Sequence, residues 1–171
     1  MDKSCFTIGE LVAIYTDPDS NRFNFGKVIA KNDAGVIISS ITPNAFSGGL
    51  ILYDLDDIYK IEKSTAYSQK MEKLITVKKP QFFEPEFSGK DFKKELLELA
   101  KTEHKLVMIK ILDGTGCDVM GHVEKVADIF CEIRQYSETG DEDGFCIVDL
   151  RDISRIHYDD YDNRDYELLI K

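Results

Sequence analysis

The sequence DLDDIYKI at residues 54–61 returns in closely related form as DLRDISRI at residues 149–156. Five of the eight positions are identical, and Lys60 is matched by another base, Arg155. The two stretches lie 95 residues apart. Because self-similarity at a fixed spacing is typical of a repeated architecture, we compared the rest of the chain with itself at the same spacing.

The spacing of 95 residues aligns further positions without a gap. The identical pairs outside the motif include Leu11 with Leu106, Val12 with Val107, Ile14 with Ile109, Gly26 with Gly121, Val28 with Val123, Asp33 with Asp128, Ile38 with Ile133, and Gly49 with Gly144. We infer that the second half of the chain is a folded copy of the first. Shared side chains then maintain the fold, and side chains that differ between the copies carry the function.

Each copy reads as about five short strands. In the first copy, alternating or short apolar runs predict strands at residues 11–15, 23–31, 36–41, 50–53 and 58–61. Turn residues separate them, among them the Asn-Asp-Ala-Gly sequence at residues 32–35. Five short strands in so few residues suit a small closed barrel, which leaves no open edge. The predicted fold is mainly β with short α-helices (α+β), as two tandem five-stranded barrels of the Sm-like or SH3-like type.

Helical periodicity follows each predicted barrel. A third helix precedes the second barrel, with Ser88 at its start. The apolar stripes of the three helices are Tyr67, Met71, Leu74 and Ile75; Phe92, Leu96, Leu99 and Ala100; and Tyr166, Leu169 and Ile170.

The predicted domains follow from these elements. Residues 1–76 form the first barrel with its C-terminal helix, residues 77–90 form a linker rich in Pro and Phe, and residues 91–171 form a helix, the second barrel and a last helix. Phe82, Phe83 and Phe87 in the linker are too apolar to leave in water, since burying each contributes roughly 1.5–3 kcal/mol. We expect them to dock within the chain and clasp the two barrels, with an exposed partner-binding motif as the alternative.

The pattern resembles the Sm-like barrels, a branch of the small SH3-like folds. The resemblance rests on Gly26-Lys27-Val28 through Asp33 to Ile38, on the motif at residues 54–61, and on the matching residues of the second copy. It implies that the helix from Asp91 is the N-terminal helix of the family, which the first copy lacks. It also implies edge-strand pairing between subunits, so the sequence leaves open a monomer, a dimer or a ring.

The residues that bind RNA in that family are replaced here. Ile37 and Glu132 stand where the family has Asn, and Asp56 and Arg151 stand where it has Gly. The uridine-rich RNA binding of the family therefore does not carry over.

Composition and charge narrow the function further. The chain has 171 residues, is 43% hydrophobic and has no apolar run of membrane-spanning or signal-peptide length, which predicts a soluble cytoplasmic protein with reduced cysteines and no membrane contact. The net charge is −10, and residues 105–171 alone carry 8 basic and 16 acidic residues. Such a surface repels phosphate backbones, so nucleic acid is an unlikely partner. The acidic excess either only maintains solubility or attracts a basic protein.

No residue pattern predicts a catalytic or cofactor site. Asp54, Asp57, Asp149 and Asp152 invite an Mg²⁺ or acid/base site, but both copies keep the pair, which favours a turn-capping role. Cys131 and Cys146 replace Val36 and Ile51 of the first copy and are expected to fill core volume. No cysteine pair has zinc spacing, and His104, His122 and His157 are scattered. We therefore predict no enzyme, no metal and no cofactor.

The predicted function is a non-catalytic protein-binding or assembly module, with a toxin-neutralising immunity-type protein as one form of it. The partner-binding candidates are acidic and aromatic residues that the first copy lacks: Glu138, Asp141, Glu142, Asp143, Tyr158, Asp159, Asp160 and Tyr161. One alternative is an Sm-like RNA-associated regulator that uses Lys70, Lys73, Lys78, Lys79, Lys90, Lys93 and Lys94. A carboxylate-dependent hydrolase is the third possibility.

Overall fold

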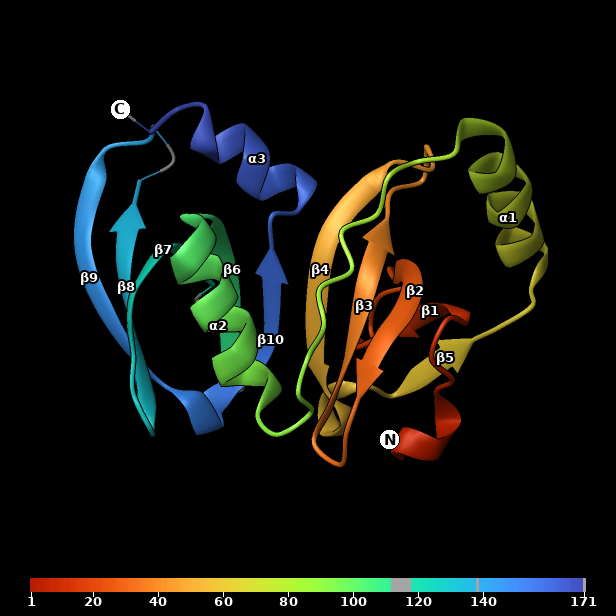
Figure 1. The fold of residues 1–171 in the computed structure, drawn as a ribbon, viewed down its shortest axis with the longest axis horizontal. Coiled ribbons are helices and arrows are strands. Elements are labelled where there is room, and N and C mark those ends of the chain that lie inside the picture. The colour runs from red at the N-terminus through yellow and green to blue at the C-terminus, as the bar shows by residue number, and fades with distance from the viewer. Residues whose placement is uncertain (112–117, 138, 171) are drawn as a thin grey trace. The chain divides into compact units, whose positions relative to one another are not determined.

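The computed structural model describes residues 1–111, 118–137 and 139–170, and its contacts divide the chain into two compact units. Unit 1 spans Met1–Lys90, and unit 2 spans Asp91–Lys171. In the described part of the chain both units are mainly β, with antiparallel strands and three short α-helices (Figure 1). The predicted fold class is confirmed at this level.

Unit 1 is a five-stranded antiparallel arrangement in the order β5-β1-β2-β3-β4. Its elements are η1 (Lys3–Cys5), β1 (Leu11–Tyr15), β2 (Asn24–Lys31), β3 (Gly35–Ile41), β4 (Ser47–Asp54), η2 (Leu55–Asp57), β5 (Lys60–Glu62) and α1 (Ala66–Lys78). The turn between β2 and β3 is held by the Asn32 side chain, whose Oδ1 accepts hydrogen bonds from the backbone N–H groups of Ala34 and Gly35. This is the turn role that Asn commonly takes between strands.

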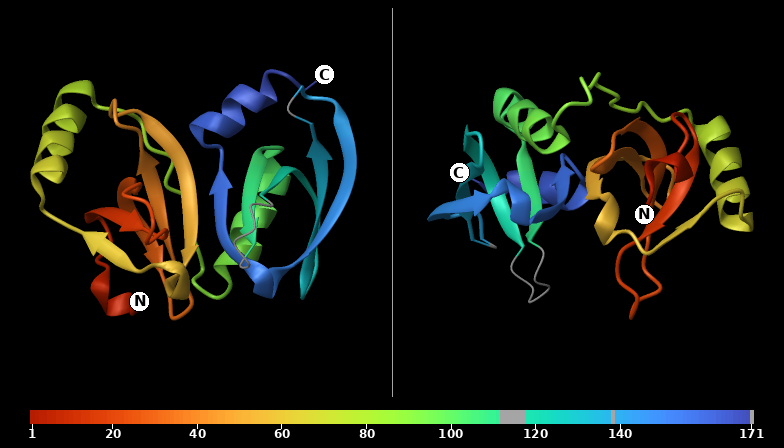
Figure 2. Two further views of the ribbon diagram at one scale, coloured as in Figure 1. Left: turned by 180° about the vertical axis from the view of Figure 1, so that it is seen from behind. Right: turned by 90° about the horizontal axis from the view of Figure 1, so that it is seen from below.

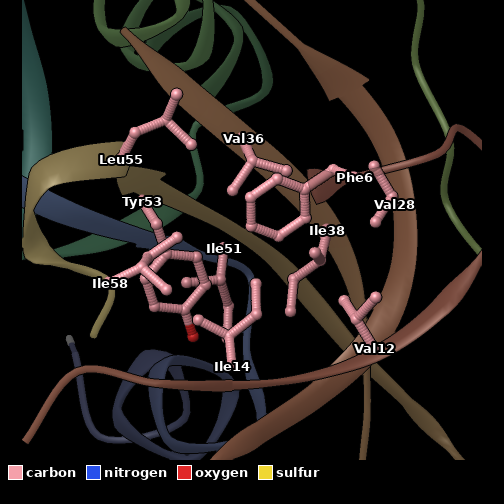
Figure 3. Packing of buried hydrophobic residues seen from close by; sticks show 10 residues of the cluster. All are labelled: Phe6, Val12, Ile14, Val28, Val36, Ile38, Ile51, Tyr53, Leu55 and Ile58. Carbon is pink, nitrogen blue, oxygen red and sulfur yellow. The ribbon is translucent and has the colours of Figure 1, made fainter. Parts of the chain in front are cut away.

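The core of unit 1 lies on the concave side of these strands. Alternate residues of β1, Val12 and Ile14, point into it, as the period of two along a strand requires. Phe6 is fully buried between Val36 and Val28 (Figure 3). The N-terminal segment therefore contributes a large side chain to the core of unit 1.

The opposite face of the same strands forms a second apolar cluster beneath α1. Thr65 caps this helix by accepting a hydrogen bond from Ser68 N, and the buried Met71 packs against Phe25 and Ile41. Phe82, which follows the helix, packs against the same cluster. The expectation of docking within the chain is confirmed for Phe82, whereas Phe83 is 39% exposed.

Unit 2 repeats the arrangement in the order β10-β6-β7-β8-β9. Its elements are α2 (Phe92–Glu103), β6 (Leu106–Ile111), β7 (Val119–Val126), β8 (Phe130–Tyr136), β9 (Glu142–Asp149), η3 (Leu150–Asp152), β10 (Ile153–Tyr158) and α3 (Tyr161–Glu167). Helix α2 packs on β7 and, more lightly, on β10 and β6.

The two units have matching strand registers. The bounds of β2, β3, β4 and η2 recur 95 residues later in β7, β8, β9 and η3. Gly26 lies opposite Ser40, and Gly121 lies opposite Gln135, which is the same pairing at the same spacing. At both glycines an added Cβ would lie within 2.6 Å of a backbone carbonyl oxygen of the next strand, so neither site has room for a side chain.

Several sequence expectations differ from the structure, among them the apolar stripe of the last helix, because α3 ends at Glu167 and Leu169 is 46% exposed. The strands of each unit are joined in an open order and do not clearly form two closed barrels. Helix α2 is capped by Asp91, whose carboxylate accepts from Lys94 N, and not by Ser88. Leu97 is buried in place of the expected Leu99, because the buried stripe begins at Phe92 and includes two adjacent leucines.

Candidate functional site

Strand β9 exposes apolar side chains that an isolated protein would normally bury. It ends the strand order of unit 2 and is the outermost strand of that unit (Figures 1 and 2). Phe145 is 53% exposed and Ile147 is 67% exposed. Their alternate neighbours point the other way, toward the core, where Val148 is buried. The two apolar side chains therefore form an open patch on the outer face of the sheet.

Acidic side chains surround the start of the same strand. Asp141, Glu142 and Asp143 are all exposed. We refer to these three residues together with Phe145 and Ile147 as the β9 surface. Three of the eight sequence-predicted partner residues thus lie next to the open apolar patch. Glu138, another of the eight, lies outside the described residues.

The backbone of β9 also has groups directed away from its neighbour β8. Leu150 N donates a hydrogen bond to the Ile129 carbonyl oxygen at 2.9 Å, and the register continues in steps of two residues through Cys131↔Val148 and Ile133↔Cys146. These pairs exchange backbone hydrogen bonds, because bonded and non-bonded pairs alternate in an antiparallel ladder. The N–H and C=O groups of the intervening Phe145 and Ile147 therefore point to the far edge of β9. In the described part of the chain no strand pairs with that edge.

Arg134 on β8 lies beside the patch, directly opposite Phe145, and is held by two carboxylates. Its Nε donates to Glu124 Oε1 at 2.7 Å, and its Nη1 donates to Glu142 Oε2 at 3.2 Å. The guanidinium carbon lies 5.1 Å from the centre of the Phe145 ring. The hydrogen bond from Arg134 lowers the pKa of Glu124 and the two acids raise the pKa of Arg134. The positive charge is thus neutralised, and the surface remains acidic.

The matching strand of unit 1 has no such open surface. At the spacing of 95 residues Leu50 and Leu52 on β4 correspond to Phe145 and Ile147, and both leucines are buried, at 0% and 1% exposure. The two strands have equal length and the same register with their neighbours β3 and β8. The exposed apolar pair is therefore present in unit 2 and has no exposed counterpart in unit 1.

The turn before β9 is ordered by its own polar side chains in the described residues. Ser137 Oγ accepts a hydrogen bond from Asp141 N at 3.2 Å, and Thr139 Oγ1 donates to Asp141 Oδ2 at 2.9 Å. Gly140 has φ +82°, a left-handed conformation that suits glycine. These contacts fix the position of the Asp141 carboxylate at the end of the β9 surface.

The other predicted partner residues are mostly structural. Tyr158 is 1% exposed and its hydroxyl donates to Glu103 Oε2 at 2.8 Å, which together with burial raises its pKa. Asp159 forms ion pairs with Lys105 and Arg164. These two side chains are therefore engaged inside unit 2.

Asp160 and Tyr161 take different places at the start of α3. Asp160 is 9% exposed, caps the helix by accepting from Asn163 N, and lies 2.8 Å from His157 Nδ1. Tyr161 is 62% exposed. Of the four tail residues predicted to bind a partner, Tyr161 is the one that unit 2 leaves open.

The cysteine and aspartate residues that were candidates for a chemical site have structural roles. Burial raises the pKa of the Cys131 thiol to about 11, which keeps it protonated, and its core position confirms the packing prediction. Asp149 caps η3 by accepting from Arg151 N, and its hydrogen bonds with Arg151 lower its pKa to about 2. The turn role predicted for Asp149 is confirmed, whereas its counterpart Asp54 makes no side-chain capping hydrogen bond to η2.

His122 on β7 lies in a small aromatic cluster and supports a prediction about pH. Its Nδ1 lies 3.0 Å from the Tyr136 hydroxyl, and the His104 ring packs edge-on at 6.4 Å. Burial is the main cause that lowers the pKa of His122 below its ordinary value of 6.5. The unfolded chain then takes up this proton at higher pH than the folded chain, so the free energy of unfolding falls as pH drops below about 6.5. Denaturant unfolding at about pH 7.5 and about pH 5.5 measures this loss.

The control for this prediction is His122→Gln, which keeps a polar side chain but cannot titrate. The variant should have a smaller loss of stability between the two pH values than the natural chain. Equal losses in both proteins would show that other groups cause the whole pH dependence, and that the cluster around His122 does not oppose protonation.

Sequence reasoning missed Phe145 and Ile147. The alternating pattern of β9 predicts a strand, but the same pattern in β4 belongs to a buried strand, so the sequence carries no signal that one strand is covered and the other open. Among the described residues no group of three or more His, Cys, Asp or Glu side chains is placed to hold a metal ion.

Comparison of the chain with protein-family models, with curated proteins and with solved structures finds no match. In the part of the chain that is described, no helix is long and apolar enough to cross a membrane.

Proposed function

We propose that the chain is a non-catalytic protein-binding module, built from a duplicated small barrel of the Sm-like or SH3-like type, and that the β9 surface of unit 2 contacts a basic protein. The observation that carries the proposal is the contrast between the two copies: Leu50 and Leu52 are buried, and their counterparts Phe145 and Ile147 are exposed. Because the two copies differ at these positions, we assign the exposure to function.

The chemistry of the β9 surface supports a protein partner. Covering two large apolar side chains favours association by roughly 1.5–3 kcal/mol for each fully buried side chain. The acids at the start of the strand add a negative rim, and an apolar centre with a charged rim is typical of protein interfaces. Residues 105–171 contain 16 acidic and 8 basic residues. Their net negative charge steers a basic partner toward this half of the chain.

A toxin-neutralising, immunity-type protein acting in the cytoplasm is the specific form of this proposal that we favour. A small chain with a net charge of −10 suits the neutralisation of one basic protein. The three described cysteines are free, in agreement with a reducing compartment.

The proposal is tested by affinity capture with the natural chain and with Phe145→Asp as bait, in a lysate of the source cells. The natural chain should recover one basic protein at stoichiometric yield. Phe145→Asp should reduce that recovery by roughly tenfold or more, because it replaces a central apolar contact by a desolvated charge. Quantitative mass spectrometry of the eluates measures the ratio.

The matched control is Phe46→Asp in unit 1. Phe46 is 59% exposed and, like Phe145, lies beside a cationic side chain, that of Lys78. Recovery with this variant should equal recovery with the natural chain. Equal recovery from all three baits would exclude the β9 surface, and recovery of nucleic acid in place of a protein, lost as salt rises, would favour the RNA-associated alternative.

A further inference from the structure

We infer that the partner binds by adding an extended basic segment to β9 as a further strand of the sheet. This inference rests on the proposed function and specifies its binding mode. It adds a backbone contribution to the side-chain contacts considered above, and it defines the partner segment by its pattern of residues.

The backbone of β9 is arranged to accept a strand. The N–H and C=O groups of Phe145 and Ile147 point away from β8, and no described strand pairs with them. A segment lying along this edge would form pairs of hydrogen bonds with both residues, which is the usual basis of strand addition to an open sheet edge. Open edges also favour non-specific pairing, so a protein that keeps one exposed and apolar needs a reason to do so.

The side chains of β9 specify the pattern of the segment. A residue directly opposite Phe145 or Ile147 places its side chain on the same face of the sheet, where an apolar group would cover the exposed ring and branched chain. Toward the start of β9 the same face presents Glu142, because Glu142 lies opposite Tyr136 and Phe145 lies opposite Arg134 on β8. Bases at this end of the segment would face Glu142 and the nearby Asp141 and Asp143. The segment therefore carries alternate apolar residues followed by alternate bases.

Unit 1 gives an intramolecular example of a segment held to the strands by side-chain contacts. After α1 the chain contacts β2 through Phe82, whose ring lies 5.8 Å from Lys27 Nζ, and through Glu84, which forms an ion pair with the same lysine. Further along, the Gly89 carbonyl accepts a hydrogen bond from Asn32 Nδ2 at 3.1 Å. An apolar anchor with an adjoining ion pair thus holds this segment to unit 1, and the β9 surface offers the same two kinds of contact with the opposite charge.

The test uses a synthetic peptide, Thr-Val-Thr-Val-Thr-Lys-Thr-Lys, and the full isotope-labelled chain in an NMR titration. The peptide places two valines and two lysines on one face of a strand. We expect amide shifts concentrated on β9 and slower hydrogen exchange at the amides of Phe145 and Ile147. The same peptide with both valines replaced by N-methylvaline cannot donate those backbone hydrogen bonds, and it should bind at least roughly tenfold more weakly. Equal binding of the two peptides would overturn the inference.

A variant of the chain tests the same hydrogen bonds from the other side. Ile147→Pro removes an outward N–H without removing a hydrogen bond to β8, which is the position where an edge strand tolerates proline. It should weaken peptide binding by about tenfold, whereas the control Phe46→Asp, in unit 1 and outside the β9 surface, should bind like the natural chain. The N-methylated peptide keeps the test decisive if the proline variant fails to fold, because it leaves the protein unchanged.

Failure of this inference is distinguishable from failure of the proposed function. If Phe145→Asp abolishes capture of the basic protein and Ile147→Pro does not, the module binds its partner through side chains and strand addition is wrong. Sedimentation tests a second copy of the chain as the occupant: self-association that Ile147→Pro abolishes would overturn the assignment to another protein. A monomer that binds the lysine-containing peptide, but not its counterpart with both lysines changed to glutamate, would support the assignment.

Discussion

Gly121→Ala is expected to destabilise unit 2 strongly, by about 3 kcal/mol, with a fall in Tm of roughly 10 °C or more. An added Cβ would lie 2.0 Å from the Arg134 carbonyl oxygen and 2.7 Å from its carbonyl carbon. Both atoms belong to the backbone of β8, so no side chain can rotate away to relieve the contact. The register between β7 and β8 has to shift, and thermal unfolding followed by circular dichroism measures the cost.

Gly144→Ala is the matched control for this prediction. Gly144 also lies in unit 2, but an added Cβ meets nothing within 4 Å, and the cost arises only from its φ of +80°. A left-handed residue other than glycine costs about 1–2 kcal/mol, so this variant should lose less stability than Gly121→Ala. If the two variants lose the same free energy of unfolding, the close approach of β7 and β8 is not the reason that position 121 requires glycine.

Gly26→Ala should reproduce the effect in unit 1. There an added Cβ would lie 2.6 Å from the Ser39 carbonyl oxygen, and Ser39 is separated from Arg134 by the same 95 residues that separate the glycines. The repeat in the sequence was found from residue identity alone, without any assumption about contacts. At both glycines an added Cβ would contact a backbone carbonyl oxygen at the matching position. This contact explains why both copies have glycine there.

The strands could be predicted from the sequence because the signals that define them are local. Alternation predicts β1 at residues 11–15 with the bounds that the structure has, and Asn32 with Gly35 predicts the turn that follows β2. Closure of the strands into barrels is a different matter, since it depends on long-range pairing that period-two alternation does not encode. The expected closure is accordingly the part of the fold that the structure does not clearly reproduce.

The candidate site could be predicted only in part, because acidity and exposure carry different information. Asp141, Glu142 and Asp143 are charged in a loop, so their exposure follows from solvation alone. Tyr158 and Asp160 are of residue types that are common in interfaces. Tyr158, however, donates a hydrogen bond to Glu103 of α2, and Asp160 caps α3. Which aromatic is open and which is buried is decided by tertiary packing, and no local pattern distinguishes Tyr158 from Tyr161.

Phe6→Ala is expected to be among the most damaging single changes in unit 1, with a loss of about 3–5 kcal/mol. Phe6 is fully buried, and its ring fills the core among side chains from β2 and β3 (Figure 3). The N-terminal segment is also tied to the strands, because Lys31 Nζ donates hydrogen bonds to the carbonyl oxygens of Lys3 and Phe6. The surroundings therefore cannot collapse easily into the cavity, and denaturant unfolding should have a lower midpoint with an unchanged slope.

Phe46→Ala separates loss of core packing from loss of an aromatic residue as such. Phe46 belongs to the same unit but is 59% exposed, so its truncation should change stability by less than about 1 kcal/mol. At the spacing of 95 residues the counterpart of Phe6 is Lys101, on α2. Unlike segments thus precede the strands of the two copies. If Phe6→Ala and Phe46→Ala cost the same, the core of unit 1 does not depend on its N-terminal segment, and the copies differ more than their strands indicate.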